Sequence, residues 1–218
     1  CASLNGDNLV FKPVDFGKKS SQMIQPSPYL TGWLDPFLKD PNFIPLLETN
    51  RGCPYGCAYC AWGVSALSKV RVRPLEQVYA EIDYIANNSA KQSSWIFCDA
   101  NFGILKRDID IAKRIRKIMD INGFPSQVII WHSKNTSERN IEIVKLIGGT
   151  HSGYVALQST DLDVLKKSGR GGIKFDALLK VLDHYKRENI PVSTDILIGL
   201  AGESAYSHRK TLFKAFDL

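Results

Sequence analysis

The stretch Arg51–Cys60 reads RGCPYGCAYC and places Cys53, Cys57 and Cys60 in a C-x3-C-x2-C spacing on one short loop. Three thiolates gathered in this way are able to hold an iron–sulfur cluster. A four-iron (4Fe-4S) cluster normally takes four cysteine ligands, so a loop that offers three leaves one iron open to a further ligand. Such an open position separates catalytic from structural metal sites. The spacing therefore favours chemistry at this loop.

A structural zinc loop is the main alternative, because cysteines also bind zinc. Such loops usually combine two short Cys/His clusters. A second cluster is not visible in the sequence: Cys98 stands alone in an apolar segment, Cys1 begins the chain, and the histidines show no ligand-like spacing. A disulfide role is weaker, since a chain of this length does not depend on such cross-links. The pattern favours iron–sulfur over zinc.

The composition is that of an ordinary globular domain, with 44% hydrophobic and 23% charged residues among 218. The formal net charge of +6 lies largely in helix-like segments such as Lys106–Lys117 and Lys166–Lys174, which is typical of solvated helix faces. Aromatic residues do not interleave with these basic runs, so charge alone does not argue for nucleic acid. No apolar stretch is long enough to span a bilayer. Because a thiolate-bound cluster with an open iron is oxygen-sensitive, we expect a reducing cytoplasm as its location.

Two parts of different character make up the chain. Residues 1–42 are rich in Pro, Gly, Ser and Lys and are interpreted as a linker or wrapping arm. In residues 43–218, the core domain, short apolar runs alternate with helix-patterned stretches, which predicts βα units and a parallel sheet. The predicted strands are Phe43–Glu48, Trp95–Asp99, Gln127–Trp131, Gly153–Gln158 and Val192–Ile198. The predicted helices are Pro74–Ala86, Asp108–Ile121, Ser137–Ile147, Asp176–Glu188 and Glu203–Phe216.

Polar or glycine-rich segments follow every predicted strand. The cysteine loop follows the first strand, and residues 99–103, 133–135, 158–160 and 199–203 follow the others in turn. Periodicity alone does not separate an open doubly wound sheet from part of a barrel. Both architectures place ligands at the carboxyl ends of parallel strands, so we expect these segments to face one site. Gly52 and Gly56 are expected to let the cysteine loop fold closely around a cluster.

The cysteine loop, with the aromatic Tyr59 just before its third cysteine, resembles the signature of the radical S-adenosylmethionine (SAM) superfamily. The resemblance implies an α/β fold, a partial (βα)6 TIM-like barrel. The sequence ends where a sixth strand would follow, so we expect an incomplete barrel. It also implies that the open iron chelates the amino and carboxylate groups of SAM. An external one-electron reductant of the flavodoxin or ferredoxin type would reduce the cluster, which cleaves SAM to methionine and a 5'-deoxyadenosyl radical that abstracts hydrogen from substrate.

The resemblance also assigns residues to the two cofactors. It implies Cys53, Cys57 and Cys60 as cluster ligands, and around SAM it implies Tyr59, Asp99, Asn101, Gln158, Ser159, Arg170 and Gly199. Asp99 looks like the acid that receives the amino group of SAM, and Asn101 supplies an amide beside the cluster. Gly199 and Tyr59 would border the adenine from two sides.

The stretch Gln158–Arg170 looks like the fourth-strand motif of methylthiotransferases and cobalamin-dependent relatives. The resemblance places Gln158 and Ser159 at the ribose hydroxyls, and it places Arg170 at the methionine carboxylate, which a guanidinium pairs in a fork geometry. Structural alternatives stay open: a helix cap for Asp99 and Asn101, a solvated loop position for Arg170, and core packing for Tyr59.

Two further groups of polar residues have no assigned role. His132, Lys134 and Asn135 follow the third strand and either face substrate or stabilise the fold. Arg71 and Arg73 alternate with apolar residues as on a half-exposed strand, and their charge would reach a cofactor or substrate carboxylate.

Glu48–Cys53 and the arm segment Ser27–Gly32 look most like the cobalamin-binding branch of the superfamily, in which an upstream Rossmann-like domain holds the corrin. That domain does not lie in these residues, so cobalamin is expected only of a longer parent protein. The reaction would be methyl transfer, a rearrangement or methylthiolation of a substrate that the sequence does not identify. Two other classes stay open: an electron-transfer module whose fourth ligand is Cys98, and a relic that keeps the barrel without its cofactor pocket.

Overall fold

Short parallel strands form the centre of the domain. The computed structural model describes residues 2–5, 8–11, 25–63, 69–135, 137–148, 153–170 and 175–217. Strands β3 (Leu46–Leu47), β6 (Ser94–Phe97) and β7 (Gln127–Ile129) form one parallel sheet in the order β3-β6-β7. Strands β8 (Gly153–Tyr154) and β9 (Val192–Ser193) form a second parallel pair. Across the described ranges, no ladder joins β7 to β8.

The predicted strands are present in the predicted order and direction, but their ladders are shorter than predicted. The first, Phe43–Glu48, is reduced to the two residues of β3. Single parallel bridges, Phe102 to His132 and Gln158 to Ile196, continue the pairing beyond the strand ends. The apolar runs thus located the strands correctly but overstated how far the ladder hydrogen bonds extend. They also overstated burial, because most of Val192–Ile198 and of Phe43–Leu46 is exposed.

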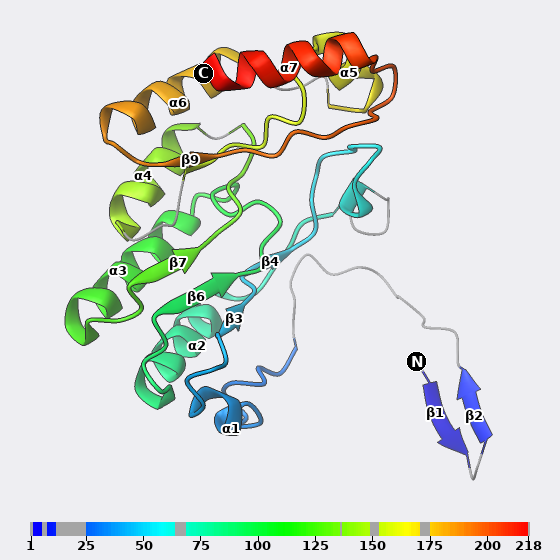
Figure 1. The fold of residues 1–218 in the computed structure, drawn as a ribbon. Coiled ribbons are helices and arrows are strands. Elements are labelled where there is room, and N and C mark those ends of the chain that lie inside the picture. Colours follow the sequence, from blue (N-terminus) through cyan, green and yellow to red (C-terminus); the bar gives the residue numbers. More distant parts are fainter. Residues whose placement is uncertain are drawn as a thin grey trace.

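At least one α-helix separates each of the parallel strands β3, β6, β7, β8 and β9 from the next, and another follows β9. The helices are α2 (Leu75–Asn88), α3 (Asp108–Asn122), α4 (Ser137–Ile147), α6 (Phe175–Arg187) and α7 (Ala205–Asp217). Figure 1 shows α2, α3 and α4 along one side of the strands. Helix α3 packs against both α2 and α4, and α4 also packs against α6. All five predicted helices are confirmed, with bounds that differ by at most two residues.

Two short helices were not predicted. Helix α5 (Leu162–Lys167) begins after Asp161, whose carboxylate accepts hydrogen bonds from the amides of Asp163 (3.0 Å) and Val164 (3.2 Å), as N-cap residues do. Because α5 ends at Lys167, the prediction of a helix face over Lys166–Lys174 was wrong from Ser168 to Arg170, and residues 171–174 lie outside the described residues. Helix α1 (Asp35–Leu38) lies in the N-terminal arm.

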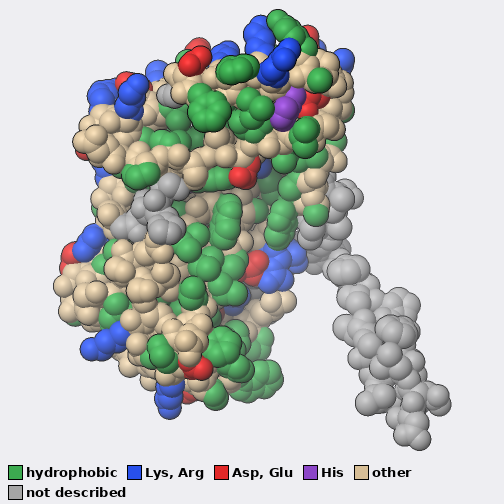
Figure 2. All heavy atoms as spheres, in the orientation of Figure 1, with side chains coloured by type: hydrophobic (Ala, Val, Ile, Leu, Met, Phe, Trp, Pro, Cys, Tyr) green, Lys and Arg blue, Asp and Glu red, His purple; other side chains and the backbone are tan. Residues whose placement is uncertain are grey.

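The main core lies between the β3-β6-β7 sheet and helices α2 to α4. It contains Trp95 and Phe97 of β6 together with Ile82, Ile111 and Ile143 from the three helices. Trp95 and Phe97 are both fully buried, as the two-residue period of a strand predicts. Figure 2 shows hydrophobic side chains gathered along the middle of one face, over the strands, with charged side chains mostly toward its margins.

A smaller core joins α4 and α6 to β8. It consists of Val144, Val155, Val181 and Tyr185. Gly153 permits this packing, because a Cβ at that position would lie 2.3 Å from ring atoms of Tyr185. The residue type at position 153 therefore determines how closely α6 approaches the second strand pair.

Part of the N-terminal arm packs onto the domain. Tyr29 and Leu38 are buried within the main core, and the Tyr29 hydroxyl donates to the carbonyl of Leu46 (2.7 Å) while it accepts from the amide of Leu46 (2.9 Å). Strands β1 (Ala2–Asn5) and β2 (Asn8–Phe11) form an antiparallel hairpin. The boundary at residue 42 stays a prediction. Over the described ranges, no helix is both long and apolar enough to cross a membrane.

Candidate functional site

The cysteine loop leaves the carboxyl end of β3 and returns through a short antiparallel pair. Strands β4 (Asn50–Arg51) and β5 (Arg71–Val72) close its base. Sequence reasoning missed this pair because each strand has only two residues, although the alternation around Arg71 was its signal. Arg73, whose role the sequence left open, is engaged within the fold: it is buried, its Nε donates to the Glu48 carbonyl (3.1 Å), and its Nη1 pairs with Glu81 (3.4 Å).

The three thiols occupy different environments on this loop. Cys53 and Cys57 are buried, whereas Cys60 is half-buried and precedes the 3-10 helix η1 (Ala61–Gly63). Gly52 has a φ of 109°, a conformation that favours glycine, and its role in folding the loop around a cluster stays a prediction. Gly56 differs, because no described atom lies within 4 Å of the Cβ that it lacks. The protein's own packing therefore does not require glycine at position 56.

Asn101 lies against the first cysteine. Its Nδ2 donates to Cys53 Sγ at 3.1 Å, and the side chain is buried. An amide donor stabilises negative charge on sulfur, which is how protein groups tune a thiolate-bound cluster. The helix-cap alternative for Asn101 and Asp99 is wrong, because α3 begins only at Asp108, whose own carboxylate accepts from the amides of Gly103 (2.8 Å) and Leu105 (3.0 Å).

Asp99 is fully buried and anchors the start of the cysteine loop. Its Oδ1 accepts from the amides of Thr49 (2.6 Å) and Asn50 (3.2 Å), and its Oδ2 accepts from the Thr49 hydroxyl and from Asn50 Nδ2 (2.7 Å). Burial raises the pKa of the Asp99 carboxyl to about 7, although these hydrogen bonds oppose the shift. Both oxygens are engaged, so the geometry does not favour the predicted contact with an amino group.

One cavity of about 360 Å³ brings most of the predicted residues together. Its lining includes Cys53, Tyr59, Cys60, Asp99, Gln158 and Arg170, and also Cys98, Trp62 and Trp131. This volume falls in the range of small-molecule sites. The loop, the second strand end and the fourth strand end thus face one space, as expected for the carboxyl edge of a parallel sheet.

Arg170 is buried beside the loop. Its Nη1 donates to the Tyr59 hydroxyl (2.7 Å), its Nη2 donates to the Ala156 carbonyl, and its side chain has no carboxylate partner among the described residues. The solvated-loop alternative is therefore wrong. A buried cation without a counter-ion is costly, so this guanidinium is suited to an anionic ligand. Tyr59 in turn donates to Gln158 Oε1 (3.3 Å) and lines the cavity rather than the core.

Four predicted residues do not line this cavity: Cys57 and Asn101, which belong to or touch the cysteine loop, and Ser159 and Gly199, which lie elsewhere. Ser159 is fully buried, shares a hydrogen bond with Thr211 (3.3 Å) and accepts from the amide of Asp161 (3.1 Å), so it connects α5 to α7. Gly199 has a φ of 80° and its amide donates to Glu203 Oε2 (2.7 Å) in the turn before α7. Neither position supports the predicted contact with ribose or adenine. Its hydrogen bond to Thr211 explains Ser159, and the local turn before α7 explains Gly199.

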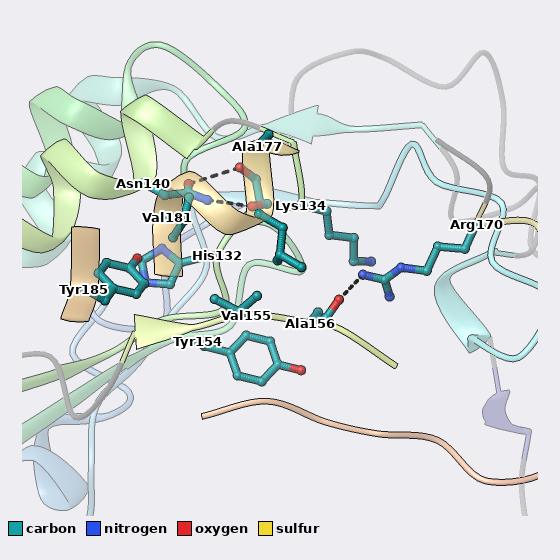
Figure 3. Close-up of a pocket in the computed structure, with 12 residues that line it drawn as sticks. His132, Lys134, Asn140, Tyr154, Val155, Ala156, Arg170, Ala177, Val181 and Tyr185 are labelled. Atoms are coloured by element: carbon teal, nitrogen blue, oxygen red, sulfur yellow. Dashed lines mark hydrogen bonds between the residues drawn. The ribbon is translucent and has the colours of Figure 1, made fainter. Parts of the chain in front are cut away.

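The end of β7 contributes residues that sequence reasoning left undecided. His132 and Lys134 both line the cavity and a smaller adjoining one of about 30 Å³. Figure 3 shows Lys134 and Arg170 extending toward each other, with His132 near Tyr185. Lys134 Nζ lies 5.1 Å from the centre of the Tyr55 ring. Within the described part of the chain, neither ring nitrogen of His132 has a hydrogen-bond partner, and burial lowers its pKa to about 4.

The donor set fits a cluster better than a single metal ion. Among the described residues, no three His, Cys, Asp or Glu side chains converge on one ion-sized position, as a structural zinc site requires. The ligands of a four-iron cluster sit at separate corners, each on a different iron. Three thiols on one loop, a buried amide on Cys53 and an adjacent cavity are the kinds of group that such a cluster requires.

The fold and the three-thiol loop together define an iron–sulfur protein with an open coordination position. Residues 47–214 match the family model described as the Radical SAM superfamily, and the chain belongs to that superfamily. This confirms the predicted family, its α/β fold, and its cofactor pair of a 4Fe-4S cluster and SAM.

The relatives indicate a branch within the family. The chain is 38% identical to 2-(S-pantetheinyl)-carbapenam-3-carboxylate methyltransferase of Streptantibioticus cattleyicolor and 37% identical to the cobalamin-dependent radical SAM methyltransferase TokK of Streptomyces tokunonensis. Each alignment covers 84% of this chain and 28% of the relative, so the chain spans under a third of their length. The fold also matches the radical SAM methyltransferase TsrM from Kitasatospora setae with a TM-score of 0.61 at 16% identity, over 80% of this chain and 32% of that one. The predicted likeness to the cobalamin-binding branch is confirmed.

Proposed function

We propose that this chain is the SAM-binding core of a cobalamin-dependent radical SAM methyltransferase. The observation that carries the proposal is Arg170, a buried guanidinium that faces the cavity beside the cysteine loop and pairs with no described carboxylate. The carboxylate of SAM would supply the missing negative charge. The methyltransferase names of both curated relatives support the reaction type.

Each part of the chain has a distinct task in this proposal. Cys53, Cys57 and Cys60 hold the cluster, and Asn101 donates to the first of these sulfurs. Arg170 orients SAM through its carboxylate, and Gln158 offers its amide to the ribose hydroxyls from the same cavity wall. When bound, the reduced cluster supplies the electron that cleaves SAM. The protein positions the cofactors and excludes competing reactions.

Several partners belong to the longer parent protein. We propose that an upstream domain holds cobalamin, that a flavodoxin or ferredoxin supplies single electrons, and that the parent works in the reducing cytoplasm because its open cluster is oxygen-sensitive. The substrate, whatever its size, presents a carbon atom to be methylated. An electron-transfer module stays the alternative function, since Cys98 is exposed and lines the same cavity.

The test is anaerobic reconstitution of the full-length protein, followed by electron paramagnetic resonance (EPR) of the reduced cluster with and without SAM. We expect SAM to change the spectrum. Arg170→Gln, compared with wild type at matched iron content, should bind SAM on the order of 10- to 100-fold more weakly, because a charge-assisted contact is lost. Arg187→Gln is the matched control, since Arg187 is exposed on α6 and pairs only locally with Asp183. An EPR spectrum of the wild-type protein that SAM does not change would favour the electron-transfer alternative.

A further inference from the structure

The turn that ends helix α5 packs directly against the cysteine loop. The amide of Ala58 donates to the carbonyl of Ser168 at 3.0 Å. A Cβ on Gly169 would lie 2.5 Å from the carbonyl oxygen of Gly56 and 3.5 Å from the amide nitrogen of Ala58. The backbone of residues 168–169 therefore contacts the backbone of the cysteine loop at two places. One is Gly56, just before the second cysteine, and the other is Ala58, between the second and third cysteines.

This turn is a rigid support. Gly169 has a φ of 69°, the left-handed conformation in which helices commonly end. The amides of Ser168 and Arg170 donate to the carbonyls of Val164 (3.0 Å) and Leu165 (2.7 Å). Val164 and Leu165 are themselves buried, so α5 is fixed to the domain and the turn is fixed to α5.

The supported part of the loop determines where two of the thiols lie. Cys57 and Cys60 flank Ala58 and Tyr59, and the amide of Cys60 donates to the carbonyl of Cys57 at 3.1 Å. The next residue of the turn, Arg170, holds the hydroxyl of Tyr59 at 2.7 Å. Three consecutive residues, 168–170, thus contact the loop at Gly56, Ala58 and Tyr59.

We infer that the 168–170 turn is a positioning element for the iron–sulfur cluster, with Gly169 as the residue that permits the contact. The turn fixes the loop segment that carries Cys57 and Cys60, of which Cys60 lines the cavity and Cys57 is buried beside it, before any cofactor is bound. This inference rests on the proposed function, because it assumes that these thiols ligate a cluster. It adds to the proposed function a positioning role for Gly169 and for the Ser168 carbonyl.

The experiment compares Gly169→Ala with Gly123→Ala in the full-length protein. Gly123 has a nearly identical φ of 71°, yet no described atom lies within 4 Å of its missing Cβ. Both variants therefore carry the same backbone strain, and only Gly169→Ala brings a new Cβ against the cysteine loop. Iron per chain, the EPR spectrum of the reduced cluster and the rate of iron loss to a chelator are measured for both, together with thermal unfolding of the iron-free proteins.

We expect Gly169→Ala to change the EPR spectrum and to lose iron on the order of 10-fold faster than Gly123→Ala, as changes to groups that support metal ligands do. Thermal unfolding of the two iron-free variants should be similar. Equal spectra and equal rates of iron loss in the two variants would overturn the inference.

A second measurement does not depend on any variant folding. In the iron-free wild-type protein, hydrogen exchange at the amide of Ala58 should be slowed by its bond to the Ser168 carbonyl. Exchange as fast as that of a free amide would overturn the inference even if the cluster assembles. If the wild-type protein assembles no four-iron cluster while the Ala58 amide is protected, the proposed function fails and the contact itself stands.

Discussion

Replacing Asp99 with Ala tests whether this carboxylate anchors the cysteine loop or binds a cofactor. The change removes the acceptor for the amides of Thr49 and Asn50 and for Asn50 Nδ2, all of them buried. Each buried donor left without a partner costs about 1–3 kcal/mol. Allowing for partial relaxation, the free energy of unfolding should fall by roughly 3–6 kcal/mol, a large share of the stability of about 5–15 kcal/mol that is typical of a domain.

The assay is urea unfolding of the iron-free protein, followed by tryptophan fluorescence. The expected loss corresponds to a midpoint shift of roughly 2 M, since such slopes are about 1–3 kcal/mol per M. Asp110→Ala is the control, because Asp110 is exposed on α3 and lies 4.0 Å from Lys113; it should cost at most about 1 kcal/mol. If Asp99→Ala unfolds like the wild type but no longer binds SAM, Asp99 is a cofactor ligand and the anchoring argument is wrong.

Three further outcomes follow from single contacts. His132, whose buried ring has a pKa of about 4 against 6.5 in the unfolded chain, should contribute stability that is complete above pH 6.5 and lost as the pH falls toward 4, by up to roughly 3 kcal/mol. Between pH 8 and pH 5 the free energy of unfolding of the wild type should therefore fall by about 2 kcal/mol more than that of His132→Gln, and an equal fall in the two proteins would count against this. Asn101→Ala removes the donor to Cys53 and should make the cluster potential more negative in an EPR-monitored titration, and an unchanged potential would contradict it. Gly153→Ala should destabilise the protein by about 1–3 kcal/mol through overpacking against Tyr185, and a melting temperature equal to that of wild type would refute the tight fit.

Local periodicity predicted the helices well and the site only in part. The bounds of α4 are those predicted, because Ser137–Ile147 is a continuous amphipathic run between two loops. Helix α5 was missed because its few residues lie inside a polar motif; the cap at Asp161 was its available signal. The role of the cysteines could be predicted from the sequence because their spacing alone indicates their chemistry.

Contacts between distant parts of the chain could not be predicted from the sequence in this way. Asp99 meets Thr49 across 50 residues of sequence, and Gly169 meets Gly56 through backbone atoms that leave no pattern in residue type. Ser159 was assigned to a ligand because it follows a strand, but its partner, Thr211, lies on a helix that periodicity does not place beside it. The sequence correctly predicted which edge of the sheet carries the site. It did not predict where each side chain points, because that depends on such tertiary partners.

Two anchors hold the cysteine loop from opposite ends: Asp99 fixes Thr49 and Asn50 before the first cysteine, and the 168–170 turn supports Gly56 and Ala58 before the last. If both act on one body, the double variant Asp99→Asn with Gly169→Ala should lose iron no faster than the more severe single variant, because one lost anchor already frees the loop. Its loss of folding stability should likewise be smaller than the sum of the single losses, since both sites hold the same loop. Rates of iron loss to a chelator and urea midpoints for the four proteins of this cycle measure both quantities. Effects on iron loss that multiply independently would show that the anchors hold separate ligands, and that the loop does not move as one unit.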